Sequence, residues 1–509
     1  MNFLKLIKAE SYTKGMVLSV IFNIISKGIL FLLTIIIARY FGSNIKTDIY
    51  FFVFAAMVLF SGLINNMDTA VLIPESMRLR VKEGDDKAAA FLNYFLLIYV
   101  IIGLLFTVMM YFFGATVFGL ISKFSEADMR TYHNYFWLGS LFFIFMVLTN
   151  LINAILTSLK YFTIPMLISS INSIVVIAAI FLFKANYDVL SIFIGGLMAY
   201  AINLIILLVV LKTIAGWHFN MGVSGLTKKI GRDILYAGLG QVTTVAGSML
   251  PLYLLSGFGS GIISAMNYGK NIADIPNTLL TSQLANVSGI KLNEQVAQKD
   301  YSGMNATFLS TSKFLVFILV PVGFFLFVFA EPIIHLFYVR GNFGAVAAEG
   351  AAVFMKLLAV TVFSIAINAM VTRIFIAKQA IKQGFIYQLI MSLLLMLLIW
   401  GFVNIYGPYG YGYAIITLNV LNIAGMFFSC QIIAPEINYA MLIRYTGIII
   451  LINGLIAAVM YFISAWLPMA GIFKMLILIS CWLFILGVIN KVWKLEFNRL
   501  LIFKKDTVS

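Results

Sequence analysis

Long apolar runs dominate this chain and restrict the folds that it can adopt. The first run, Met16 to Tyr40, is followed by runs of similar length almost to the C-terminus. Of the 509 residues, 62% are hydrophobic and only 10% are charged, whereas soluble domains carry about 25% charged residues. A helix needs about 20 apolar residues to cross the hydrocarbon core of a bilayer. The sequence therefore predicts an all-α polytopic membrane protein.

A hydropathy window of about 19 residues predicts about 14 transmembrane helices. The eighth of these is predicted at residues 262–288, where Lys270 and Asp274 interrupt the apolar pattern, and the ninth at residues 313–337. The runs lack the alternation of about 10-residue segments that is typical of an outer-membrane barrel. Helices are therefore expected to form the membrane domain.

A weak internal repeat divides the predicted helices into lobes. Phe41-Gly42-Ser43 follows the first helix, and Phe258-Gly259-Ser260 follows the seventh. The alternative is a chance match in a chain rich in Phe and Gly. If the repeat is real, it predicts a transporter whose two lobes rock around a central site. The predicted divisions are an N-terminal lobe of six helices at 1–220, a C-terminal lobe of six helices at 221–440, and two further helices with a cytoplasmic tail at 441–509.

The distribution of positive charge predicts the orientation. With the N-terminus inside, most of the 34 Lys and Arg residues fall in cytoplasmic segments, as the positive-inside rule requires. An even number of helices puts both termini in the cytoplasm. The basic loops also account for the net charge of +15 through topology and contact with anionic lipids, without nucleic acid as a partner. We expect a multi-pass protein of the cell (inner) membrane.

Lys27 lies near the middle of the first apolar run, and Lys270 lies in the eighth predicted helix. A charge at the centre of a spanning helix costs about 2.5–3.5 kcal/mol on insertion scales, so such residues usually face a polar cavity or a partner. The two ammonium groups suit an anionic substrate such as a diphosphate. The alternative is a structural role, in which Lys27 pairs with Asp68 and Lys270 with Asp274.

Further polar residues of these helices are candidate substrate-binding groups. Amides and hydroxyls supply hydrogen bonds that suit sugar hydroxyls or pyrophosphate oxygens. Arg39, at the end of the first helix, is either an interfacial anchor or a residue of the cavity rim. The candidates beside the two lysines and Arg39 are Asn23, Ser26, Asn65, Asn66, Asp68 and Asn271.

No pattern in the sequence indicates a chemical reaction. There is no phosphate-binding P-loop, no H-E-x-x-H motif, and no soluble domain that would hold an ATPase. Cys430 and Cys481 have neither redox nor metal-ligand spacing. We therefore expect a protein that is not an enzyme and that uses neither a cofactor nor a metal.

Three segments resemble one known family. They read IARYFGSNIKTDIYFF at 37–52, AMNYGKNIADIP at 265–276 and AEPIIHLFYVRGNF at 330–343. These segments are similar to those of the MurJ/MviN-type lipid II flippases, within the multidrug/oligosaccharidyl-lipid/polysaccharide exporter superfamily. The resemblance implies two six-helix lobes, a central cationic cavity, and a hydrophobic groove formed partly by the last two helices.

Several family positions differ in this chain. The family's Ser-Arg pair in the first helix falls on Ser26 and Lys27, and a second arginine falls on Leu33. The arginine-rich part of the second helix has become residues 60–66, with Asp68 near the family's acidic position. The Asp-Arg pair of the eighth helix meets Lys270 and Asn271. The resemblance keeps the fold but leaves the identity of the lipid open.

The predicted function is a flippase that moves a polyprenyl-diphosphate-linked saccharide, similar to lipid II, to the outer leaflet by alternating access for peptidoglycan biogenesis. Membrane lipids and envelope-assembly proteins are further candidate partners. One alternative is a flippase of O-antigen or exopolysaccharide precursors. A cation-coupled drug antiporter is less favoured because cavity lysines repel cationic drugs, and a non-transporting scaffold is the remaining alternative.

Overall fold

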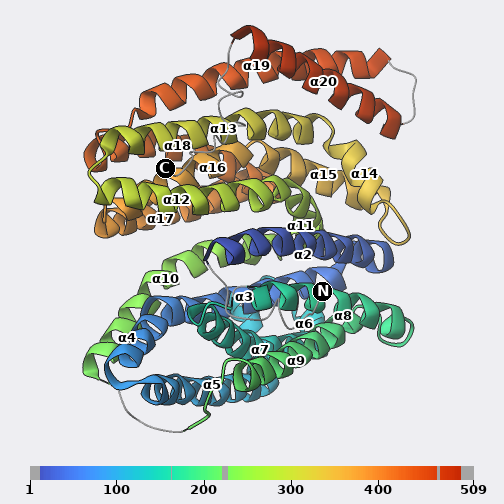
Figure 1. Cartoon of the computed structure of the whole chain (residues 1–509). Coiled ribbons are helices and arrows are strands. Elements are labelled where there is room, and N and C mark those ends of the chain that lie inside the picture. The colour runs from blue at the N-terminus through green and yellow to red at the C-terminus, as the bar shows by residue number, and fades with distance from the viewer. Residues whose placement is uncertain (1–11, 162, 221–226, 467–470, 494–509) are drawn as a thin grey trace, which may run out of the picture. The chain divides into compact units, whose positions relative to one another are not determined.

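The computed structural model describes residues 12–161, 163–220, 227–466 and 471–493, and every regular element in these ranges is helical (Figure 1). Both predicted cytoplasmic termini, within 1–11 and 494–509, lie outside the described residues. The chain divides into two compact units. Unit 1 holds Met1–Ser264 with Arg340–Phe343, and unit 2 holds Ala265–Val339 with Gly344–Ser509. The predicted lobe boundaries at 220 and 440 come from the sequence repeat and stay a prediction.

Unit 1 is a bundle in which α3 packs against α7 and α10, and α2 packs against α8. The pairs α5 with α7 and α8 with α9 also lie side by side (Figure 1). Its helices are α2 (Tyr12–Phe41), α3 (Ile45–Met67), η1 (Asp68–Leu72), α4 (Ile73–Glu83), α5 (Asp85–Ile121), α6 (Glu126–Thr131), α7 (His133–Ser158), α8 (Thr163–Tyr187), α9 (Leu190–Thr213) and α10 (Lys228–Leu255).

Unit 2 is built around α13, which packs against α12, α15, α16 and α19. Phe308, Leu315 and Leu319 of α13 lie in its buried core with Met370 and Ile374 of α16. Its helices are α11 (Ile262–Ala273, whose first turn belongs to unit 1), η2 (Asn277–Thr281), α12 (Ser282–Ala297), α13 (Tyr301–Val328), α14 (Ala330–Tyr338), α15 (Ala345–Ala359), α16 (Val362–Ala377), α17 (Ile381–Tyr406), η3 (Gly407–Tyr409), α18 (Gly410–Ile433), α19 (Tyr439–Trp466) and α20 (Gly471–Trp493).

Local sequence determines the turn between α2 and α3. Gly42 has φ +70°, a left-handed conformation that favours glycine. Asn44 then caps α3: its side chain accepts from the amide of Thr47, and the Thr47 hydroxyl accepts from the amide of Asn44 at 2.9 Å. This reciprocal capping box satisfies amides that the first turn leaves without a helical partner.

The predicted all-α polytopic class is confirmed. By length and composition, 10 described helices are able to span a membrane, or 11 if the bent pair α15 and α16 forms one span. This is fewer than the predicted number of about 14. One reason is that α17 and α18 are counted together as a single apolar stretch from Lys382 to Ile433, and another is that the apolar stretch Gln241–Leu255 of α10 is too short to be counted.

Two helices are each interrupted by a π turn. The helix that begins at Ile45 passes through η1, and the helix that begins at Ile262 passes through η2. The two starting points have the same offset as the repeated Phe-Gly-Ser segments. In η1, the Thr69 hydroxyl donates to the carbonyl of Asn65 at 3.1 Å. The π turns themselves begin 23 residues into the first helix (Ile45 to Asp68) and 15 into the second (Ile262 to Asn277), so only the helix starts follow the repeat. Such π turns are frequent at functional sites.

Candidate functional site

Lys27 and Ser26 lie on different sides of α2, because consecutive residues are about 100° apart on a helix. Ser26 is buried, and its hydroxyl donates to the hydroxyl of Ser169 on α8 at 2.9 Å. Lys27 is exposed, and Asn23, which is half-buried, precedes it by about one turn on the same side. The α2–α8 contact therefore fixes the helix so that Lys27 remains uncovered within unit 1.

Lys27 forms neither an ion pair nor a hydrogen bond with its side chain in the part of the chain that the structure describes. Asp68, its alternative structural partner, instead accepts a hydrogen bond from the Tyr99 hydroxyl. The Lys27–Asp68 pair that would have explained the lysine structurally is therefore not formed. An ammonium group on an apolar helix without an internal partner is available to an anionic ligand.

Asn65, Asn66 and Asp68 lie where α3 passes into η1. Asn66 donates to the carbonyl of Ala237 on α10 at 3.5 Å, and Asn65 is half-buried. Asp68 is fully buried. The three residues are close in the chain, but only the two asparagines retain exposed surface, so Asp68 is not a surface contact for a large ligand in this conformation.

Arg39 lies at the other end of unit 1, close to a network around Asp48. Its guanidinium lies 5.6 Å from the ring centroid of Tyr40, and its carbonyl accepts from the amide of Asn342 at 2.9 Å. Its side chain is exposed. Arg39 is more than two helical turns from Lys27 along α2, so the two cations are not one cluster.

Asp48 is the centre of the most connected buried polar group in this part of unit 1. Its carboxylate accepts from the backbone amides of Gly261 at 2.6 Å and Ser264 at 2.7 Å, and from the Ser264 hydroxyl. Ser43 donates to the carbonyl of Gly261 at 2.7 Å. The network ties the start of α3 to the segment between α10 and α11.

Lys270 and Asn271 belong to α11 in unit 2. The Lys270 side chain is exposed and Asn271 is half-buried. The charge of Asp274 acts on Lys270 from about one turn away, so the structural alternative remains for this lysine. The structure does not bring Lys270 and Asn271 into a side-chain hydrogen bond with one another.

Unit 2 also contains apolar grooves at α13. One, of about 320 Å³, lies between α13 and α20, where Phe317, Pro321 and Leu486 line it together with Asn490. A second, of about 220 Å³, is lined by Phe324 of α13 with residues of α15, α16 and α19. Both grooves have the chemical character that suits a long hydrocarbon chain, because their linings are almost entirely apolar.

The sequence reasoning missed a buried cation. Lys313 of α13 is only 6% exposed, and its ammonium nitrogen lies 5.5 Å from the ring centroid of Tyr445. The predicted ninth helix began at residue 313, whereas α13 begins at Tyr301, with Asp300 as its N-cap. That error placed Lys313 at the end of the predicted helix, where a lysine is able to reach the membrane interface and does not indicate a buried charge.

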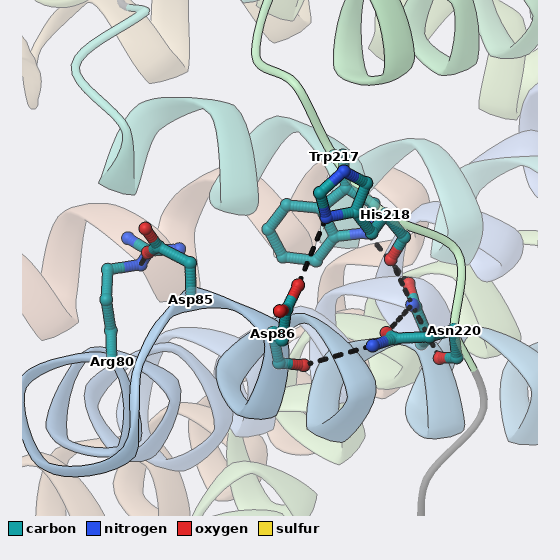
Figure 2. Close-up of polar contacts among 7 residues, drawn as sticks. Arg80, Asp85, Asp86, Trp217, His218 and Asn220 are labelled. Carbon is teal, nitrogen blue, oxygen red and sulfur yellow. Dashed lines mark hydrogen bonds and ion pairs between the residues drawn. The ribbon is translucent and has the colours of Figure 1, made fainter.

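A polar cluster at the start of α5 was also missed (Figure 2). Asn93 accepts from the indole N–H of Trp217 at 2.8 Å and donates to the carbonyls of His218 and Asn220 at 2.8 and 2.9 Å. Nδ1 of His218 lies 3.1 Å from Oδ1 of Asp86. These contacts, which we call the Asn93 cluster, fasten the segment after α9 to α5.

The described residues contain no group of three or more His, Cys, Asp or Glu side chains that would hold a metal ion. Glu436, between α18 and α19, lies 2.8 Å from the ammonium of Lys378. Burial raises the pKa of Glu436, but the hydrogen bond and charge of Lys378 outweigh it and hold this pKa below its ordinary value. Glu436 and Lys378 thus form an ion pair that joins the end of α16 to the turn between α18 and α19.

This chain is similar in sequence and in fold to proteins described as lipid II flippases. A probable lipid II flippase MurJ of Borreliella burgdorferi is 23% identical over 360 residues, covering 68% of this chain and 69% of that protein. A solved lipid II flippase MurJ in an inward closed conformation matches with a TM-score of 0.79 and 19% identity, over 94% of this chain and 99% of that one.

The fold is also similar to that of a multidrug resistance MATE family transporter of the MOP superfamily in an inward-facing conformation. That match has a TM-score of 0.66 at 17% identity and covers 82% of this chain and 94% of the transporter. The model of one family, described as lipid II flippase MurJ, matches residues 37–481. This match extends over most of the sequence, and the chain belongs to the MurJ family.

Proposed function

We propose that this protein flips a polyprenyl-diphosphate-linked saccharide, similar to lipid II, from the cytoplasmic to the outer leaflet for peptidoglycan biogenesis. The observation that carries the proposal is an exposed, unpaired Lys27 on an apolar helix of a MurJ-family chain. A diphosphate is the anionic group that such a cation would hold. The protein would act as a transporter, not as an enzyme.

In this mechanism the headgroup rests on the exposed side of α2. Lys27 supplies the charge, and Asn23, about one turn before it on the same side of α2, supplies a hydrogen-bonding group. Ser26, on another side of the helix, would hold α2 in place through its hydrogen bond to Ser169. Asn65 and Asn66 are the hydrogen-bonding groups of the second helix, and Arg39 is a rim residue toward the far end. Lys270 and Asn271 would play the matching part in the other half of the repeat.

The lipid tail needs a separate, apolar path. We assign it to the groove between α13 and α20, because Phe317, Pro321 and Leu486 offer hydrocarbon contact. Without a protein path, the headgroup would lose water from many polar groups, each at about 2–7 kcal/mol. A polar surface that replaces this water lowers the barrier for the headgroup.

The membrane potential is a sufficient energy source for this step. A charge that moves outward from an inside-negative cell gains about 2.3 kcal/mol per 100 mV. We infer that the protein lies in the cell (inner) membrane with both termini in the cytoplasm, since the basic loops then follow the positive-inside rule. Membrane lipids and envelope-assembly proteins are the proposed partners.

A flippase of O-antigen or exopolysaccharide precursors is the second candidate. It is favoured by Leu33 and by residues 60–66, which stand where the resembling family carries arginines. Both substrates share the polyprenyl diphosphate, so Lys27 serves either one. A drug antiporter fits less well because Lys27 would repel a cationic substrate.

Complementation of a strain conditionally depleted of its lipid II flippase separates these candidates. Growth on expression of this chain supports lipid II-like transport. If the protein inserts into the membrane and the strain still lyses, the peptidoglycan proposal fails. Rescue of a strain that lacks an O-antigen flippase would then establish the second candidate.

A further inference from the structure

The flippase proposal gives no role to Asp68, whose carboxylate lies in a chemically unfavourable environment. It is fully buried at the first position of η1. One carboxylate oxygen accepts from the Tyr99 hydroxyl, and the other, Oδ2, has no hydrogen-bond partner among the described residues. A buried carboxylate without a compensating cation or full hydrogen bonding is strongly unfavourable.

A second buried oxygen without a partner lies on α7. Asn153 Oδ1 has no hydrogen-bond partner in the described part of the chain. Helices α3 and α7 run in the same direction, because their contacts advance together: a Cβ at Gly139 would meet Val53, and the Ser61 hydroxyl lies 3.6 Å from the sulfur of Met146.

The same alignment of α3 with α7, continued along both helices, pairs Asp68 with Asn153. Each lies two helical turns beyond the pair formed by Ser61 and Met146, and η1 itself contacts α7. An interval of seven residues keeps a side chain close to one face of a helix. The two oxygens without partners are therefore brought to the same level of the α3–α7 contact.

Neighbouring elements offer Asp68 no positive charge. Tyr99 is the titratable group that faces it from α5. Helix α7 carries no charged residue between His133 and Lys160. On α10, the contacts of Asn66 and Met67 reach Ala237 and Gly238, and the nearest charges along that helix, Arg232 and Asp233, precede them by about one turn.

Glu75 is the next acidic group along the same helix, and Arg78 pairs with it. None of the ion pairs in the described residues includes Asp68. The site thus combines a carboxylate, an amide oxygen and a phenol oxygen without a cationic side chain.

We propose that Asp68, Tyr99 and Asn153 form a binding site for one monovalent cation, H⁺ or Na⁺. A proton on Oδ2 of Asp68 would donate to Oδ1 of Asn153 and give both oxygens a partner. A sodium ion would use the same oxygens as ligands, since hard cations prefer oxygen. Either ion supplies the positive charge that the buried carboxylate lacks.

Occupancy of this site would be linked to the conformation of a helix that carries proposed headgroup residues. The site adjoins the π turn of the helix that carries Asn65 and Asn66, so its occupancy and the conformation of that helix depend on one another. This inference goes beyond the identity of the lipid. Its test uses the full chain in detergent without any lipid-linked sugar, so failure leaves the flippase proposal unaffected.

The sodium arm measures thermal unfolding during titration with NaCl, with KCl at equal ionic strength as the reference. A sodium site predicts a saturable rise in Tm that Asp68→Asn abolishes and that Asn153→Leu weakens at least tenfold in apparent affinity. Asp188→Asn, a half-exposed carboxylate paired with Lys46, is the matched control and keeps the wild-type response.

The proton arm uses infrared difference spectra across a pH titration in sodium-free buffer. A proton site predicts a carboxylic-acid carbonyl band that disappears in Asp68→Asn and shifts in Tyr99→Phe, because that variant removes the hydrogen bond to the other oxygen. The Asp188→Asn spectrum retains the band.

Either arm, if positive, identifies the ion. The inference is overturned if the wild type shows neither response, or if the responses persist unchanged in Asp68→Asn. Should Asp68→Asn fail to fold, Tyr99→Phe and Asn153→Leu decide the matter, because a signal that neither variant alters does not come from this site.

Discussion

The carboxylate of Asp48 accepts a hydrogen bond from the backbone amide of Gly261 at 2.6 Å. The two residues lie in different halves of the sequence, yet the bond is buried and Ser264 supplies two more donors. Gly261 has φ +93°, a conformation that L side chains rarely adopt. The segment between α10 and α11 is thus shaped to present its amides to one carboxylate.

Replacing Asp48 with Ala should destabilise the protein markedly. It leaves the amides of Gly261 and Ser264 buried without an acceptor, and a hydrogen bond to a charged group contributes about 1.5–3 kcal/mol. We expect a clear fall in Tm in detergent, whereas Asp188→Asn, on the exposed surface, changes Tm little. An unchanged Tm for Asp48→Ala would show that the network adds nothing to stability.

Lys27→Ala should abolish flipping while the protein still inserts and folds. The ammonium has no internal partner to lose, so Tm should stay near that of the wild type, and Lys27→Arg should retain activity because the charge remains. Flipping is measured as the accessibility of labelled lipid-linked sugar in proteoliposomes. Lys212→Ala, at the exposed end of α9, is the matched control; if it and Lys27→Ala are equally active, Lys27 is not part of the site.

Gly139→Ala should weaken the contact between α7 and α3. A Cβ at residue 139 collides with the Val53 side chain, and overpacking a close contact costs about 1–3 kcal/mol. The second substitution Val53→Ala makes room, so the double variant should recover part of the lost Tm. Failure of this rescue would contradict the close approach of the two helices.

Glu436→Gln should reduce stability at neutral pH and have little effect in acid. The pKa of Glu436 is held below 4.5 in the folded protein by Lys378, so its contribution is present above about pH 4.5 and is lost as pH falls through the lowered value. The side chain is 31% exposed, so the difference should be small. Melting curves from neutral to acidic pH test this; a difference that grows in acid would reverse the assigned sign.

Asn93→Leu should loosen the segment after α9. It removes the acceptor of the Trp217 indole and the donor to two carbonyls, while leaving the helix intact. Hydrogen exchange should become faster at residues 217–220 than in the wild type. Asn220→Ala, which leaves the contact of Asn93 with Trp217 in place, should produce a smaller change.

The class of fold was predictable because hydrophobicity along one helix is a local property. Ile262 was placed correctly at the start of its helix, and Ser26 and Lys27 were correctly selected as polar residues of α2. Their separate surroundings were not predictable, since the burial of Ser26 depends on Ser169 of α8. The assignment of these residues to substrate binding stays a prediction.

Long-range contacts account for what the sequence did not reveal. Asp48 was visible as an acidic residue, but its partners Gly261 and Ser264 supply mainly backbone amides, which carry no sequence signal. The depth of Lys313 was concealed because the polar stretch Tyr301–Ser312 was left out of the predicted helix. The π turns leave hydropathy unchanged, so a hydropathy window does not detect them.

The π turn η1 also determines the helical phase of everything that follows it. A π turn holds more residues than an α turn, which places Ile73–Glu83 out of step with a helical wheel drawn from Ile45. Deleting one residue from 68–72 would restore a regular helix yet rotate this segment by about 100°. Ser76 and Leu79, now buried, would turn away from their neighbours. The extra residue therefore selects which side of the helix end faces the protein.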